Sequence, residues 1–132
     1  MIACNGSAEP YTFVGRVVGL VYSGTIVKAP DTVAVGSPFS ASFITFGGGC
    51  IIASVGEEIA DSGNLVVVTP YDSVNPRVSA CEYSDRRLLP HAPQLQFNQR
   101  GPATVRVRGA SNALEHGAAP VWLTIERLVY VQ

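Results

Sequence analysis

The side chains best suited to chemistry are three cysteines and two histidines: Cys4, Cys50, Cys81, His91 and His116. A serine hydrolase of the G-x-S-x-G kind is not indicated, because no such segment occurs in the sequence. Either Cys50 or Cys81 could pair with His91 as a nucleophile and base. A disulfide together with an exposed loop histidine explains the same residues without any catalytic role. We therefore predict no catalytic residue and no enzyme activity, with a cysteine-based or metal-dependent enzyme as the less favoured hypothesis.

Candidate metal ligands are scattered along the chain rather than clustered. One set comprises Asp85, His91, Glu115 and His116, and a second set near a turn comprises Glu57, Glu58, Asp61 and Asn64. The two histidines have unlike neighbours, and no C-x-x-C spacing is present to indicate zinc. A blue-copper site usually has an axial methionine, but the only methionine is Met1. Acidic clusters like the second set are usually solvated turns. We expect no metal and no other cofactor.

Cys50 and Cys81 are predicted to form a disulfide. The cysteine count is odd, so one thiol must remain outside any pairing within the chain. A bridge between Cys50 and Cys81 would close a loop of about 30 residues and stabilise the fold by roughly 3–4 kcal/mol in chain-entropy models. Such bridges persist in oxidising compartments, which favours a location outside the cytoplasm. The alternative is a pair of buried free thiols.

The N-terminal segment is similar to the processed end of a bacterial lipoprotein. A small residue, Ala3, precedes Cys4, and residues 5–10 are small and polar, as expected for a flexible tether over residues 1–10. On this interpretation Cys4 carries the lipid, Met1 was added for expression, and the signal peptide has been removed, since no complete signal peptide is present. The alternative is an ordinary N-terminus with an incidental cysteine.

Composition indicates one globular domain. The chain has 132 residues, of which 47% are hydrophobic and 14% charged, so it can bury a core and is too apolar for a disordered tail. The formal net charge is −1, so the chain lacks the excess of basic residues that would indicate a nucleic-acid partner. No apolar run approaches the roughly 20 residues that a membrane helix needs. A membrane contact is therefore expected only through a lipid anchor.

Strand signals dominate the chain, and helix signals are nearly absent. Residues 39–46 and 103–108 alternate between apolar and polar side chains, which predicts strands with one buried face. Residues 121–131 are predicted to form a long closing strand, with Val121, Leu123 and Ile125 on one face. A tight turn is predicted at residues 61–64, before an apolar strand, whereas residues 70–85 are predicted to be a long loop. Residues 11–132 are thus predicted to form one β-sandwich domain of about seven to nine strands.

Two segments carry a resemblance to a known class of domain. In residues 30–39 a short strand ends at a glycine and the next begins with an aromatic residue, and Gly47-Gly48-Gly49-Cys50 ends a strand. This sequence pattern resembles that of bacterial immunoglobulin-like sandwich domains of small secreted lipoproteins of unassigned function. The resemblance covers roughly residues 11–132 and implies an immunoglobulin-like antiparallel β-sandwich. It departs from antibody domains because Trp122 lies in the last strand, not between the two cysteines.

These observations favour a non-catalytic interaction or structural module in the periplasm, on the outer membrane or at the cell surface. Its expected partner is a protein or glycan that the sequence does not identify. The alternative is a small-ligand or carbohydrate-binding domain that uses the loop over residues 70–93. The candidate contact residues for that alternative are Tyr71, Tyr83, Arg86, Arg87 and His91, with Trp122 as a further aromatic surface. The competing interpretation is that these aromatic side chains fill the core.

Overall fold

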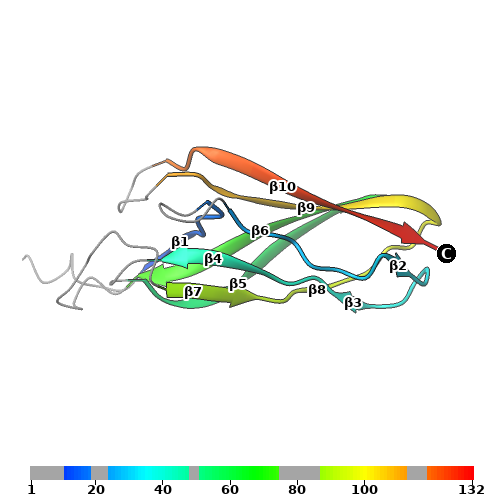
Figure 1. Ribbon diagram of the computed structural model, residues 1–132, viewed down its shortest axis with the longest axis horizontal. Coiled ribbons are helices and arrows are strands. Elements are labelled where there is room, and N and C mark those ends of the chain that lie inside the picture. The colour runs from blue at the N-terminus through cyan, green and yellow to red at the C-terminus, as the bar shows by residue number, and fades with distance from the viewer. Residues whose placement is uncertain (1–10, 19–23, 48–50, 75–86, 113–118) are drawn as a thin grey trace, which may run out of the picture.

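The computed structural model describes residues 11–18, 24–47, 51–74, 87–112 and 119–132, which form ten strands and no helix (Figure 1). Accordingly, none of these residues belongs to a helix long and apolar enough to cross a membrane. The strands are β1 (Tyr11–Val14), β2 (Thr32–Val33), β3 (Phe39–Ser40), β4 (Phe43–Gly47), β5 (Ile51–Ser62), β6 (Leu65–Val74), β7 (Arg87–His91), β8 (Gln94–Leu95), β9 (Gly101–Ala110) and β10 (Trp122–Val131).

The strands form one large sheet and two short pairs. The large sheet has the order β1-β6-β9-β10-β2, and β5 pairs with β6 along most of its length. The short pairs are β4 with β7 and β3 with β8. Figure 1 shows β9 and β10 along one side of the molecule, with these short pairs along the other. This sandwich-like, all-β architecture confirms the predicted fold class.

Most strand pairings are antiparallel, as predicted, but two are parallel. β6 runs parallel to β9, with Val66 opposite Val105, and β10 runs parallel to β2, with Val131 opposite Val33. Parallel neighbours require a crossover connection rather than a tight turn. The chain from β6 to β9 passes through β7 and β8, which belong to the short pairs, before it returns to the large sheet.

The hairpin of β5 and β6 is longer than the sequence predicted. Its turn lies at Gly63 and Asn64, within the predicted segment, and Ser62 is opposite Leu65. Gly63 has a φ of 69°, a left-handed value that glycine adopts without steric cost. The prediction of a loop beginning at residue 70 is wrong, because β6 continues to Val74. Here β6 is paired with β5 on one side and with β1 on the other.

The core lies between the inward faces of the strands, where side chains alternate as predicted. Val105 and Val107 of β9 are fully buried, whereas the alternating Arg106 and Arg108 reach solvent. On the opposite layer Phe39 and Phe43 are buried, and Phe39 stacks on Phe97 with ring centroids 5.8 Å apart. The inward faces also bury polar side chains, among them Thr45, Asp72 and His91.

Candidate functional site

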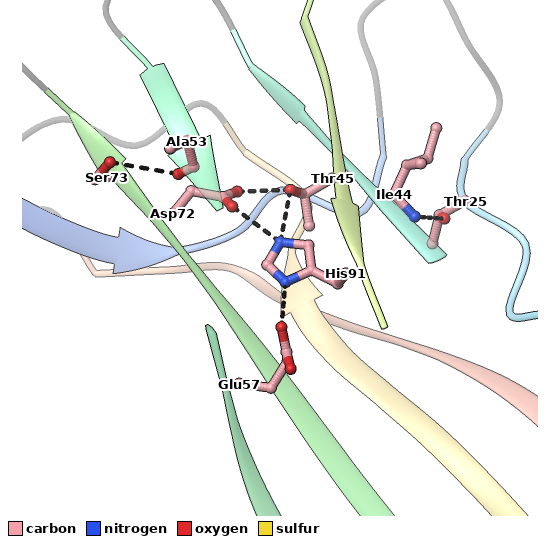
Figure 2. Close-up of polar contacts among 8 residues, drawn as sticks. All are labelled: Thr25, Ile44, Thr45, Ala53, Glu57, Asp72, Ser73 and His91. Atoms are coloured by element: carbon pink, nitrogen blue, oxygen red, sulfur yellow. Dashed lines mark hydrogen bonds and ion pairs between the residues drawn. The ribbon is translucent and has the colours of Figure 1, made fainter. Parts of the chain in front are cut away.

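A buried polar cluster joins four strands of the sandwich. It consists of Thr45 on β4, Glu57 on β5, Asp72 on β6 and His91 on β7 (Figure 2). Thr45 and Asp72 are fully buried, and His91 retains only 2% of its surface exposed. Glu57 is the one member that solvent reaches, with 16% of its side chain exposed. Polar groups buried this deeply are expected to satisfy one another, and their geometry shows that they do.

The imidazole of His91 lies between two carboxylates. Its Nδ1 is 2.7 Å from Glu57 Oε2, and its Nε2 is 2.9 Å from Asp72 Oδ1. The Thr45 hydroxyl donates a hydrogen bond of 2.6 Å to the second oxygen of Asp72 and lies 3.2 Å from His91 Nε2. Every side chain in the cluster therefore has a partner of suitable chemistry.

This arrangement favours the doubly protonated form of His91. Burial by itself disfavours the charged imidazolium, but the hydrogen bonds and charges of Asp72 and Glu57 outweigh that effect. Together they raise the pKa of His91 above its ordinary value. An imidazolium donates from both ring nitrogens, and each nitrogen here faces a carboxylate oxygen. The cluster then carries one positive charge between two negative ones.

Close packing holds the imidazole and the carboxylates in place. The Phe43 ring stacks on His91 with centroids 5.2 Å apart and planes tilted by only 5°. Gly15 lies against the other side of the cluster, where a Cβ atom would come within 2.7 Å of Thr45 Cγ2 and 2.8 Å of Asp72 Oδ2. Glycine is therefore the residue that this close approach of the backbone allows.

In its doubly protonated form, His91 has no free nitrogen lone pair with which to act as a general base or a metal ligand. An open hollow of about 370 Å³ includes His91 in its wall, beside Lys28, Ile44 and Pro90. Because the side chain of His91 has no exposed surface, its imidazole is not presented to that hollow. Among the described residues, no group of three potential ligands is arranged to hold a metal ion.

A second feature is the exposed face that β9 and β10 share. On β10 every second side chain from Trp122 to Tyr130 points to solvent. Leu128 is 73% exposed, Tyr130 54% and Trp122 40%. Arg108 of β9 lies over the Trp122 ring at 3.5 Å from its centroid.

Charged side chains occupy the middle of this face. Arg106 of β9 and Glu126 of β10 are directly opposite each other and form an ion pair of 2.6 Å. We call this surface the β9–β10 face. It comprises Trp122, Glu126, Leu128 and Tyr130 of β10 and Arg106 and Arg108 of β9. Apolar side chains thus lie on both sides of a central ion pair.

The described structure places two of the predicted ligand-contact residues, Tyr71 and His91, in strands rather than in the predicted loop. The interpretation of His91 as an exposed loop residue is wrong, because it lies in β7 with its side chain in the core. Tyr71 lies in β6 and donates a 3.2 Å hydrogen bond to Glu58. Partial burial and then Glu58 raise the pKa of Tyr71. Trp122, which the sequence placed in the last strand, begins β10.

Of the second candidate metal set, Glu57 joins the buried cluster, whereas Glu58 and Asp61 lie on β5 and Asn64 lies in the turn. Most of the remaining predicted site residues lie outside the described part of the chain. These are Cys4, Cys50, Cys81, Tyr83, Asp85, Arg86, Glu115 and His116, together with the side chain of Arg87. The predicted disulfide and the lipid attachment at Cys4 therefore stay predictions. The carbohydrate-binding alternative also stays a prediction, because most of its contact residues fall in the same segments.

The sequence did not predict that Thr45, Glu57 and Asp72 would join His91. A signal was present in β6, where Val66, Val68 and Asp72 occupy the same inward face. A carboxylate at a core position of a strand needs a buried partner. The alternation does not say which partner, because that depends on the strands packed against it.

Comparisons with protein-family models, curated proteins and solved structures found no match.

Proposed function

We propose that this chain is a non-catalytic interaction module that binds a protein partner through the β9–β10 face. The observation that carries the proposal is the exposure of Leu128, Tyr130 and Trp122 on one face of two long strands. Aromatic residues and arginine are enriched at protein interfaces, where they contribute most of the binding energy. The strands also hold these side chains in place, so few side chains have to become ordered when a partner binds.

The buried cluster supports a structural rather than a chemical role for the polar residues of the core. His91 holds two carboxylates and offers no free nitrogen to a substrate. The four side chains of the cluster come from four strands, so the contribution of the cluster is to hold those strands together.

The compartment and the anchor are proposed from the sequence. A lipid on Cys4 and a bridge between Cys50 and Cys81 both fit a module outside the cytoplasm of a bacterium. The immunoglobulin-like identity is likewise a proposal, supported by the sandwich architecture. A partner-binding face opposite the short strand pairs would be free to meet another molecule at a cell surface.

Site-specific photocrosslinking tests the proposed binding face. A photoreactive benzophenone amino acid is placed at position 128, in the full chain produced in its native host, and irradiated in living cells. The matched control carries the same group at position 94, where Gln94 is exposed on β8, away from the β9–β10 face. Defined protein adducts from position 128, absent from position 94, are expected. Equal labelling from both positions, or none from position 128, contradicts the proposal.

A further inference from the structure

We propose that the partner of the β9–β10 face is a second copy of this chain, related by a two-fold axis that runs along the strands between β9 and β10. This inference rests on the proposed function and names its partner. Two-fold dimers are the commonest oligomers, and they require a surface that is complementary to itself. The pattern of side chains on β9 and β10 meets that requirement.

The strand register supplies the geometric argument. Within one chain, Glu126 is opposite Arg106, Leu128 is opposite Thr104, and Tyr130 is opposite Pro102. A two-fold axis midway between the two strands places β10 of one copy over β9 of the other. Each side chain of β10 then faces, across the interface, the same type of residue that it neighbours within its own sheet.

Charge is complementary in this arrangement. Glu126 of each copy faces Arg106 of the other, so the two in-chain ion pairs become a ring of four alternating charges at the centre. The apolar side chains of Leu128 and Tyr130 cover Thr104 and Pro102 beside that ring. A net charge of −1 per chain adds little repulsion between copies.

The size of the face sets the expected strength. Ten residues of strand span about 33 Å and the two neighbouring strands about 10 Å, which gives roughly 300 Å² per copy. Stable complexes bury about 800 Å² on each partner. We therefore expect a weak, reversible dimer, strengthened wherever two copies are held on one membrane.

The first test compares two leucine variants of the full chain. Leu128 is 73% exposed on the β9–β10 face, and Leu88 is 49% exposed on β7, so Leu88→Lys is a matched control for Leu128→Lys. Sedimentation equilibrium from about 1 µM to 1 mM should show a dimer for the unmodified chain and for Leu88→Lys. Leu128→Lys should raise the dissociation constant about tenfold or more, a change of at least 1.4 kcal/mol.

The second test distinguishes pairing between copies from pairing within one chain. Glu126→Arg and Arg106→Glu each remove the in-chain ion pair, and each places like charges across the proposed interface. Either variant alone should be monomeric, whereas an equimolar mixture should form a one-to-one dimer. The single tryptophan, Trp122, gives a second readout, because partial covering of its ring should shift its emission to shorter wavelength on mixing.

The two proposals fail in different ways. A chain that is monomeric up to 1 mM overturns the second-copy inference, and so does a mixture that does not associate. If position 128 still crosslinks to another protein in the host, the interaction face stands with a different partner. If position 128 crosslinks to nothing, both proposals are overturned.

Discussion

His91 Nε2 and Asp72 Oδ1 lie 2.9 Å apart inside the sandwich, and neither side chain exposes any surface to solvent. The contact connects β7, which pairs with β4, to β6 of the large sheet. With Glu57 on the other ring nitrogen, the imidazole holds three strands at one point. The stability of this part of the fold therefore depends on the charge of a single histidine.

Removing one partner of the cluster should be strongly destabilising. His91→Leu leaves Asp72 and Glu57 without their shared donor, and breaking a buried charge pair costs about 3–5 kcal/mol. Urea unfolding followed by circular dichroism measures the change in the free energy of unfolding.

An apolar replacement of the three most deeply buried members of the cluster serves as the comparison for that measurement. Thr45→Val, Asp72→Leu and His91→Leu combined should recover most of the loss, because well-packed apolar groups often replace buried ion pairs at little cost. A single variant His91→Leu that unfolds like the unmodified chain would show that the charge pairing contributes little.

The stability of the protein should fall as the pH rises above neutrality. The pKa of His91 in the folded protein lies above its value of about 6.5 in the unfolded chain, so the folded state binds the proton more tightly. The stabilisation is complete below about pH 6.5 and is lost as the pH rises through the folded pKa. Urea unfolding at intervals from pH 6 to pH 9 measures this decline.

Two controls accompany the pH series. His91→Gln should lack the decline that is specific to His91, and NMR titration of the imidazole of His91 gives its folded pKa directly. A titration midpoint below 6.5 would contradict the assignment of a stabilised imidazolium.

Gly15→Ala should destabilise the fold through steric overlap. Its new Cβ would lie 2.7 Å from Thr45 Cγ2 and 2.8 Å from Asp72 Oδ2, both within the tightly packed cluster. Overpacking of this kind costs about 1–3 kcal/mol. Thermal unfolding should show a clear loss relative to Ser40→Ala, an exposed position on β3 where a change within about 0.5 kcal/mol is expected. Equal stability of the two variants would mean that the cluster shifts freely to admit a methyl group.

Cys50 and Cys81 should be joined by a disulfide in the protein purified without reductant. The bridge would restrict the unfolded ensemble over about 30 residues, and its reduction should lower stability by roughly 3–4 kcal/mol. Peptide mapping with and without reduction identifies the bridged peptides, and Cys4 should lie outside the pair. Free thiols at Cys50 and Cys81 in air-oxidised protein would argue against both the bridge and the oxidising compartment.

The sequence by itself determined the class of fold and the buried face of its clearest strands. Alternation in a strand has a period of two residues, so a short segment such as β9 reveals which side chains point inward. The turn at Gly63 was visible for the same local reason, since small and polar residues mark tight turns. The end of β6 was missed because Pro70 resembled the start of a loop, whereas pairing with β1 and β5 keeps it in the sheet.

Only the tertiary structure decided how the polar residues meet. Thr45 and His91 are 46 positions apart in the chain, and Asp72 and His91 are 19 apart. Their contact depends on which strands become neighbours and in what register, and that is set by the packing of the entire core. The same holds for Arg106 and Glu126, whose pairing follows from the register of β9 and β10. Local patterns fix the direction of a side chain, but the side chain it meets is fixed by long-range packing.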